Sequence, residues 1–370
     1  MKIVFTGGGT AGHIYPIIAI IKEIKKNNPN VSFYYIGPKD DFALTALQEE
    51  NVIIKIISAG KIRRYLSFQN IIDILYRIPK GFFQSFYYIY TINPDLIFSK
   101  GGYGSITPVI ASWILQTPIF LHESDSIPGL ANRVNGKLAL VIFLAFGIKQ
   151  ISFFSPNKLM VVGNPIRSEI LQGNLDEAKR IFSLSGEKPV ILILGGSQGA
   201  QIINETILLM MPDFLEKFEV IHQTGEKNIK EIEKESKTVI PENLQKYYHA
   251  LGFLDKNKLK HAYKASDLII ARAGAGTIFE IAEIEKPSIL IPLKGSAQNH
   301  QVKNAYAFAQ DGKSIVIEQE NLKAHFLLEK IKYLFSQRSI MEEMKKKCRN
   351  FAKPNAAKII AEYIISYLEQ

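Results

Sequence analysis

Residues 2–16 read KIVFTGGGTAGHIYP, and this stretch decides the fold that we expect. A short β-branched and aromatic run, 2–6, leads directly into a glycine-rich loop, and an apolar segment of helix length follows. Glycine allows positive φ and lets another molecule approach the main chain closely. Because the free N–H groups at a helix start can hold phosphate oxygens, this order of strand, loop and helix predicts an anion-binding turn of an α/β domain.

The same alternation runs through the rest of the chain. Apolar runs of strand length, separated by amphipathic stretches of helix length, occur at 2–6, 31–37, 53–58, 95–100, 118–123, 140–146, 189–196, 218–225, 267–274, 287–293 and 313–319. Such strands are typical of parallel sheets covered on both faces. A chain of 370 residues has room for two domains. We therefore predict an α/β protein with two doubly wound, Rossmann-like domains whose parallel sheets face a cleft, with the seam near 161–170.

Charge and composition limit the kinds of partner that we expect the chain to bind. The formal net charge is +10, and residues 1–162 hold 16 Lys and Arg against 9 Asp and Glu. This excess favours an anionic partner in the first half, such as nucleic acid, an acidic lipid surface or a phosphorylated substrate. The single cysteine, Cys348, has no partner for a disulfide or a multi-cysteine metal site. The opening run before the glycines is too short for a signal-peptide core, so we expect a cytoplasmic chain.

Two further glycine loops follow predicted strands, KGGYGS at 100–105 and LGGSQGA at 194–200. One such loop could be only a tight turn, but three at equivalent positions in both halves favour phosphate binding. The first loop also sets Gly7, Gly9 and Gly12 in G-x-G-x-x-G register, which leaves a nicotinamide- or flavin-dependent oxidoreductase as an alternative. That alternative explains neither His13 nor the other two loops.

Seven segments together resemble one known family. In chain order they are GGTAGH with Pro16, GGYGS, HESDSIPGLANR, GNPIR, GGSQGA, RAGAGTIFEIAEIEKPSILIPL and NHQVKNA, spanning about residues 3–305. The pattern is similar to that of the MurG family of bacterial peptidoglycan glycosyltransferases. The resemblance implies the GT-B fold and an inverting enzyme without metal or cofactor. It also implies transfer of N-acetylglucosamine from UDP-N-acetylglucosamine (UDP-GlcNAc) to the muramyl sugar of lipid I, which gives lipid II.

The resemblance also predicts domains and partners. We expect an acceptor and membrane-facing domain at 1–162, a donor domain at 163–345 and a C-terminal helix, 346–370, that packs back on the first domain. The partners implied are UDP-GlcNAc, lipid I, the cytoplasmic face of the membrane and other proteins of cell-wall synthesis, without nucleic acid. Two alternatives stay open: another GT-B enzyme such as a UDP-GlcNAc 2-epimerase or a glycolipid synthase, and a non-catalytic basic protein that binds lipid or nucleic acid.

Donor binding is assigned mainly to the second half. Glu280 lies about one turn into the helix that begins at AGT, where its carboxylate can accept hydrogen bonds from two ribose hydroxyls. Alternatively, it only complements the helix dipole. The resemblance assigns Arg167 to the charge that develops on the leaving UDP and Leu254 to a main-chain contact with uracil. The substrate-binding residues that we expect are Thr10, Ala11, Gly12, Asp125, Arg167, Ser197, Leu254, Ala275, Gly276, Thr277, Glu280 and Gln301.

His13 is the candidate base on the acceptor side. The positive end of its helix disfavours imidazolium, and a neutral ring can take the acceptor's proton. Glu123 is the rival base, and either residue could instead be structural. We expect the acceptor diphosphate to bind loops that contain Gly8, Gly9, Gly101, Gly102, Gly104 and Ser105. Ala11 and Asp125 depart from a pattern that often has glycine and asparagine, and an ionised aspartate cannot donate hydrogen bonds to sugar hydroxyls.

Residues 61–90 combine basic and aromatic side chains. Lys61, Arg63, Arg64, Arg77 and Lys80 are interleaved with apolar residues such as Tyr65, Phe68, Phe82 and Phe83. The segment lacks an unbroken apolar run of the length that crosses a bilayer, so we predict that it lies on the membrane surface. Buried core and single-stranded nucleic-acid binding are the alternatives. The sequence also lacks Asp-x-Asp and His-Glu-x-x-His, two simple metal-site signatures.

Overall fold

The chain folds into two compact units. The structure, a computed structural model, describes residues 1–8, 11–61, 67–147, 153–196 and 199–370. Unit 1 comprises Met1–Arg167 and Lys353–Gln370, and unit 2 comprises Ser168–Ala352. The chain therefore leaves unit 1 after Arg167 and returns at Lys353, where the sequence led us to expect boundaries at 162 and 345. The described donor-side residues from Leu254 to Gln301 belong to unit 2.

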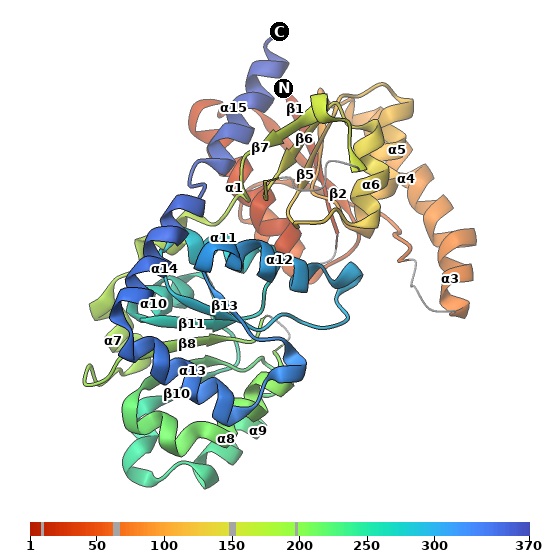
Figure 1. The fold of residues 1–370 in the computed structure, drawn as a ribbon. Coiled ribbons are helices and arrows are strands. Elements are labelled where there is room, and N and C mark those ends of the chain that lie inside the picture. The colour runs from red at the N-terminus through yellow and green to blue at the C-terminus, as the bar shows by residue number, and fades with distance from the viewer. Residues whose placement is uncertain (9–10, 62–66, 148–152, 197–198) are drawn as a thin grey trace. The chain divides into compact units, whose positions relative to one another are not determined.

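Unit 1 is built on a seven-stranded sheet in the order β3-β2-β1-β4-β5-β6-β7 (Figure 1). Its strands are β1 (Lys2–Thr6), β2 (Ser32–Gly37), β3 (Ile53–Ile56), β4 (Leu96–Ser99), β5 (Ile119–Glu123), β6 (Val141–Leu144) and β7 (Leu159–Val161). All neighbouring strands pair in parallel, for example Val4 of β1 with Tyr34 of β2. The predicted parallel sheet is confirmed.

Helices cover both faces of this sheet. They are α1 (Ala11–Asn27), α2 (Asp41–Gln48), α3 (Phe68–Ile72), α4 (Ile78–Ile92), α5 (Ile106–Ile114), α6 (Leu130–Leu138) and α15 (Ala356–Leu368). Alternate residues of β1 enter different apolar clusters: Phe5 packs with Ile17 and Ile360, whereas Val4 packs with Ile89. This alternation is expected of a strand buried on both sides. The cluster around Phe5 contains Ile360 of α15, which explains why the C-terminal segment belongs to unit 1, beside α1 in Figure 1.

Unit 2 contains a six-stranded parallel sheet in the order β10-β9-β8-β11-β12-β13. Its strands are β8 (Val190–Leu194), β9 (Glu219–Gln223), β10 (Tyr248–Leu251), β11 (Leu268–Ala271), β12 (Ser288–Leu290) and β13 (Ile315–Val316). Its helices are α7 (Leu175–Phe182), α8 (Gln201–Lys217), α9 (Ile229–Val239), α10 (Lys256–Ala265), α11 (Ala275–Glu283), α12 (His300–Ala309), α13 (Ala324–Ser336) and α14 (Arg338–Phe351). The doubly wound architecture is thus confirmed in both halves.

The strand orders locate one binding edge in each unit. In unit 1 the order reverses between β1 and β4, and in unit 2 it reverses between β8 and β11. Ligands of open α/β sheets bind at the carboxyl ends of the strands at such a reversal. The glycine loops after β1, β4 and β8 and the start of α11 lie at these two edges. The fold therefore brings together, within each unit, the loops that the sequence singled out.

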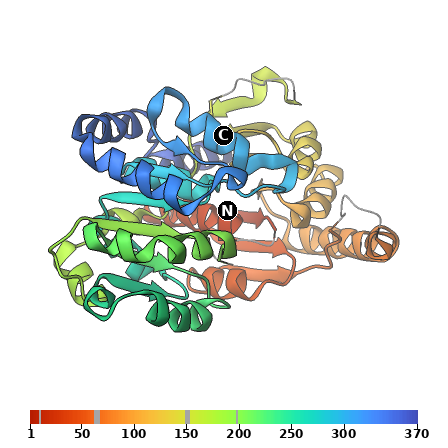
Figure 2. The same cartoon turned by 60° about the horizontal axis from the view of Figure 1, so that its bottom comes forward.

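The predicted surface segment forms α3, one π-helical turn at Asp73–Arg77, and α4. In both views this orange segment lies at the outside of unit 1 (Figure 2). Phe68, Leu75, Phe83 and Tyr87 are exposed on it. The core alternative is therefore wrong for these side chains, although Phe82 is half-buried against the core. Arg63, Arg64 and Tyr65 fall outside the described residues.

None of the helices in the described part of the chain has the length and hydropathy that a bilayer crossing requires. The exposed apolar side chains of α3 and α4 form a surface that suits a partner. Its aromatic residues follow a helical spacing, with Phe83, Tyr87 and Tyr90 on one side of α4. Their neighbours at Ser85 and Ile89 face the opposite way and are buried.

Candidate active site

The two glycine loops of unit 1 pack against each other at the sheet edge. A Cβ added to Gly8 would lie 3.0 Å from the main-chain nitrogen of Gly104, and one added to Gly104 would lie 2.4 Å from Cδ of Pro38. Gly101 and Gly102 have φ of +86° and +82°, in the left-handed region that glycine tolerates. Side chains at these positions would force the loops apart. The loops therefore need glycine to bring their main chains together.

His13 lies in the first turn of α1, with Ala11 and Gly12 at the helix start. A Cβ added to Gly102 would lie 3.2 Å from its Nε2, so the imidazole ring rests against the second glycine loop. The predicted base therefore lies beside the loops that are expected to bind the acceptor diphosphate. Gly9 and Thr10 fall outside the described residues.

Glu123, the rival base, ends β5 and is only 3% exposed. Its Oε1 accepts a hydrogen bond from the main-chain N–H of Asp125 at 2.8 Å. Its Oε2 accepts from Nδ2 of Asn132 at 2.8 Å and from the N–H of Gly129 at 3.2 Å. Burial, with the nearby Asp125 carboxylate, raises the pKa of Glu123 to about 7. This carboxylate organises the turn that follows β5.

Ser105 has a structural place beneath the second loop. Its Oγ donates to the carbonyl oxygen of Gly102 at 2.8 Å and accepts from Nδ2 of Asn135 at 2.8 Å. The side chain is fully buried. A Cβ added to Gly101 would lie 2.3 Å from Oδ1 of Asn132, so this loop also rests on the side chain that Glu123 holds. Ser105 thus stabilises the loop from inside the unit.

Lys100 is a site residue that the sequence reasoning missed. It follows β4 directly, and its side chain is 2% exposed, although a lysine beside glycines usually reaches solvent. Its Nζ donates to Oγ of Ser124, which in turn donates to Oδ1 of Asn164 at 3.0 Å. Burial lowers the pKa of Lys100 to about 8, against the opposing effect of Glu123. The only signal in the sequence was its position next to the glycine loop.

Arg167 lies at the end of unit 1, where its guanidinium stacks on the ring of Tyr15 at 4.2 Å from the ring centroid. A stacked guanidinium keeps its N–H edge available for hydrogen bonds while its orientation is restrained. Tyr15 comes two residues after His13 on α1. The predicted leaving-group cation therefore contacts α1, the helix that also carries the candidate base.

The donor side of unit 2 centres on the start of α11. Gly274 precedes the helix, and a Cβ added to Gly274 or Gly276 would meet no atom within 4 Å. Ala275, Gly276 and Thr277 form the first turn, where open space lies next to free N–H groups. Such a helix start suits a phosphate group. The open start of α11 is where the sequence predicts the pyrophosphate site.

Glu280 lies in the second turn of α11 and is 7% exposed. Its Oε2 accepts a hydrogen bond from the hydroxyl of Tyr263 at 2.9 Å, and Tyr263 is itself buried on α10. The bond satisfies one oxygen of the buried carboxylate and restrains its orientation. Tyr263 is a second residue that the sequence reasoning did not identify.

The remaining donor-side residues have local partners. The main-chain N–H of Leu254 donates to Oε1 of Gln223 at 3.2 Å, and Nε2 of Gln223 donates to the carbonyl oxygen of Gly196 at 3.0 Å. Gln223 thus joins the loop after β8 to the segment after β10. Oε1 of Gln301 accepts from the N–H of Leu293 at 3.0 Å, which anchors the loop after β12. Ser197 falls outside the described residues.

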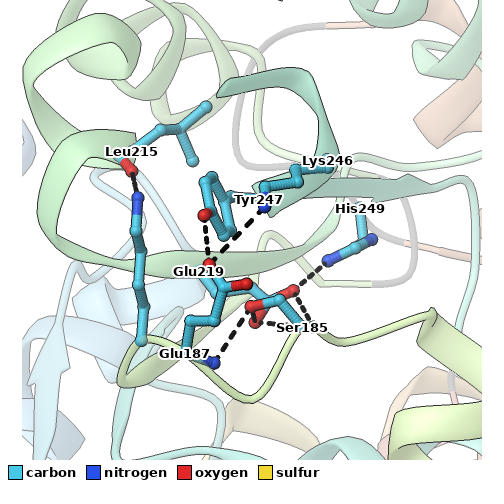
Figure 3. Close-up of polar contacts among 8 residues, drawn as sticks. Ser185, Glu187, Leu215, Glu219, Lys246, Tyr247 and His249 are labelled. Atoms are coloured by element: carbon cyan, nitrogen blue, oxygen red, sulfur yellow. Dashed lines mark hydrogen bonds and ion pairs between the residues drawn. The ribbon is translucent and has the colours of Figure 1, made fainter. Parts of the chain in front are cut away.

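A separate polar cluster surrounds Glu219 at the start of β9 (Figure 3). The buried carboxylate accepts from the N–H and hydroxyl of Ser185 and lies 2.8 Å from Nε2 of His249. Because the carboxylate stands between the hydroxyl and the imidazole, the imidazole cannot take the hydroxyl proton as it does in a nucleophilic triad. This cluster ties the segment before β8 to β10 and is structural.

Comparison with known proteins identifies the family. Residues 3–144 match the glycosyltransferase family 28 N-terminal domain, and residues 190–360 match the glycosyltransferase family 28 C-terminal domain. A UDP-N-acetylglucosamine–N-acetylmuramyl-(pentapeptide) pyrophosphoryl-undecaprenol N-acetylglucosamine transferase of Clostridium botulinum is 35% identical over 98% of this chain and 99% of its own length. A transferase of the same name, numbered 3, from Bacillus thuringiensis is 36% identical over 90% of this chain and 91% of its own.

Solved structures show the same fold. The crystal structure of MurG from Acinetobacter baumannii superposes with a TM-score of 0.74 at 24% identity, covering 99% of each chain. The UDP-GlcNAc 2-epimerase of Neisseria meningitidis, bound to UDP-GlcNAc, gives a TM-score of 0.72 at 14% identity, covering 99% of this chain and 100% of its own. The predicted GT-B fold is confirmed. The full-length sequence relatives decide between these neighbours: the chain belongs to glycosyltransferase family 28, among the MurG-type N-acetylglucosaminyltransferases.

Proposed function

We propose that the chain transfers N-acetylglucosamine from UDP-GlcNAc to the muramyl sugar of lipid I, the undecaprenyl-linked pyrophosphoryl MurNAc-pentapeptide, and so makes lipid II. The observation that carries this proposal is the 35% identity, over 98% of the chain, to a transferase named for this donor and acceptor. The epimerase alternative shares the fold at only 14% identity. Incubation with UDP-GlcNAc and a lipid I analogue tests the proposal, because transfer, epimer formation and no turnover are distinct outcomes.

Within this reaction we assign the base to His13. The acceptor hydroxyl oxygen attacks the anomeric carbon as its bond to the β-phosphate oxygen breaks, UDP leaves with the electron pair, and the imidazole takes the hydroxyl proton. The ring of His13 rests on Gly102, with no side chain between it and the glycine loop. Glu123 fits the role of base poorly, because it is buried and both its oxygens accept main-chain or amide N–H groups.

On the donor side, Glu280 receives the ribose hydroxyls and the first turn of α11 receives the pyrophosphate. The support is the open space at Gly274 and Gly276 and the buried, oriented carboxylate one turn further on. A carboxylate accepts from two neighbouring hydroxyls at once, and helix N–H groups donate to phosphate without a metal ion. Arg167, held by Tyr15, supplies a cation to the departing UDP.

The acceptor carries a polyprenyl chain, so the enzyme works at a membrane surface. We assign the contact to the exposed face of α3 and α4, on which Phe83 is 70% and Leu75 is 74% exposed. Lys80 lies over the ring of Tyr76 at 5.5 Å, so a cation accompanies the aromatic face. Aromatic and basic side chains together suit an anionic bilayer surface. The enzyme is then peripheral, on the cytoplasmic face of the membrane.

A further inference from the structure

The side-chain amide of Gln223 lies between two loops of the donor side. Gln223 is the last residue of β9, and β9 lies between β8 and β10 in the sheet of unit 2. Its Nε2 donates to the carbonyl oxygen of Gly196, after β8, at 3.0 Å. Its Oε1 accepts from the main-chain N–H of Leu254, after β10, at 3.2 Å. One side chain on β9 therefore holds the segments that follow both neighbouring strands.

The environment of this amide fixes its orientation. Gln223 is only 6% exposed. The carbonyl oxygen of Gly196 can only accept a hydrogen bond and the N–H of Leu254 can only donate one, so the amide must present its NH₂ group to the first and its oxygen to the second. An apolar replacement loses both bonds, and an ionised carboxylate loses the bond to Gly196.

The main chain beyond Gln223 supports the same loop after β8. Gly199 has φ of +75°, and a Cβ added to it would lie 2.3 Å from the carbonyl oxygen of Thr224. That oxygen accepts from Nδ2 of Asn204 at 3.0 Å and from Nδ2 of Asn228 at 2.9 Å. Gly196 and Gly199 thus both rest on the residues at the end of β9.

The segments that Gln223 joins are those to which we assign the nucleotide. A Cβ added to Gly196 would meet no atom within 4 Å, so space is open beside this glycine as it is at the start of α11. The strands that precede these two openings, β8 and β11, are neighbours in the sheet. The side chain of Leu254 is buried, so this residue has its main chain to offer to a ligand.

We propose that Gln223 is a positioning residue of the donor site: its amide sets the main chains of Gly196 and Leu254 in place before UDP-GlcNAc binds. Gln223 acts through these two segments. Loops that are already ordered bind a ligand without a further loss of conformational freedom. The inference deepens the proposed function and rests on it, because the segments that Gln223 holds are those assigned to the nucleotide.

Gln223→Met tests this inference, with Gln245→Met as the matched control. Gln245 is a glutamine of unit 2 whose Nε2 donates to the carbonyl oxygen of Ile240, in the segment that leads into β10. We expect Gln223→Met to weaken UDP binding about tenfold in calorimetric titration and to raise KM for UDP-GlcNAc by a similar factor. Its kcat and its KM for a lipid I analogue should change by less than about twofold, and the control should change none of these constants.

Gln223→Glu tests the bond to Gly196 by itself. The new carboxyl group donates to the carbonyl oxygen of Gly196 only when it is protonated. Relative to the wild type at the same pH, we expect this variant to bind UDP about tenfold more weakly at about pH 9 and within about threefold at about pH 5.5. A residue that only filled space would show no such dependence on pH.

The outcomes separate this inference from the proposed function. If the wild type binds UDP but does not transfer the sugar, the proposed function fails and the UDP affinities still decide the inference; a wild type that does not bind UDP overturns both. The inference is overturned if Gln223→Met binds UDP as the wild type does, or if its acceptor KM rises as much as its donor KM. It is also overturned if the relative affinity of Gln223→Glu is equal at the two pH values. Should Gln223→Met fail to fold, Gln223→Glu decides, and if neither variant folds, Gln223 is structural and the inference is wrong.

Discussion

The hydroxyl of Tyr263 donates a hydrogen bond to Oε2 of Glu280 at 2.9 Å, and both residues are buried in unit 2. This bond comes from α10 and restrains the orientation of the carboxylate on α11. Oriented groups bind a ligand without losing further side-chain freedom. We therefore expect Tyr263 to contribute to nucleotide binding through Glu280.

Tyr263→Phe removes this one hydroxyl and leaves the ring in place. We expect it to weaken UDP binding by about 1 kcal/mol, near the ordinary worth of one hydrogen bond. It should also narrow the preference for UDP over 2′-deoxy-UDP, because the ribose hydroxyls are the groups that Glu280 accepts. Calorimetric titration measures both. Tyr306→Phe is the matched control, since Tyr306 bonds an exposed glutamate, Glu318.

Glu280→Ala tests two separate claims: that Glu280 binds the ribose, and that Tyr263 acts through Glu280. If Glu280 binds ribose, its removal should cost about 1.5–3 kcal/mol of UDP binding, the range for hydrogen bonds to a charged group. Adding Tyr263→Phe to Glu280→Ala should then have almost no further effect. An unchanged affinity in Glu280→Ala would contradict the ribose assignment. If the losses of UDP binding in the two single variants add up in the double variant, the coupling between Tyr263 and Glu280 is contradicted and the ribose assignment is not.

His13→Ala tests the assignment of the base. We expect kcat to fall by about 10²- to 10⁴-fold, with a small change in KM for UDP-GlcNAc, because a general base acts on the acceptor hydroxyl in the transition state. Steady-state kinetics with a lipid I analogue measure both constants. Glu123→Gln is the comparison, and its main effect should be on KM for the acceptor. If His13→Ala keeps its kcat while Glu123→Gln abolishes activity, the base is Glu123.

The exposed face of α4 can be separated from its buried face by paired substitutions. Replacing Phe83 and Tyr87 by serine should reduce sedimentation with anionic vesicles and leave the melting temperature nearly unchanged. Phe82→Ser should instead lower the melting temperature, because Phe82 packs partly against the core. Transfer to a soluble, short-chain acceptor should survive the Phe83 and Tyr87 changes. Vesicle binding equal to that of the wild type would contradict the membrane assignment.

The stability of the protein should depend on pH through Glu123. Its pKa is raised from 4.5 to about 7 in the folded chain, so between these values the folded state holds a proton that the unfolded state has lost. The free energy of unfolding contributed by this group therefore falls as pH rises through that window. Glu123→Gln should remove this fall in a series of urea unfolding midpoints. Identical pH dependence in the two proteins would contradict the raised pKa.

The alternation of apolar runs was enough to predict both parallel sheets, because strands buried on both faces leave a clear hydrophobic pattern. Four-residue β10, Tyr248–Leu251, was not predicted, since its sequence YHAL lies at a sheet edge and carries little of that pattern. The glycine loops were found from their composition. Their close packing at Gly8 and Gly104 depends on contacts between strands β1 and β4, far apart in the chain.

Lys100 and Tyr263 were missed in the sequence for the same physical reason. Lys100 donates to Ser124, and Tyr263 donates to Glu280, so both side chains have partners far away in the sequence. A lysine is expected at the surface and a tyrosine in a helix is expected to be ordinary core. The sequence alone does not show which partner the fold brings into contact with the lysine or the tyrosine. His13 and Glu280 could be predicted as site residues because the family pattern surrounds them in the sequence.

The most direct test of the account is one transfer assay with the purified wild-type chain, UDP-GlcNAc and a lipid I analogue. We predict formation of the disaccharide product, lipid II, together with one UDP for each sugar transferred, and no turnover of UDP-GlcNAc when the acceptor is left out. Release of UDP with formation of a free epimerised sugar, or no consumption of UDP-GlcNAc in the presence of the acceptor, would contradict the proposed function.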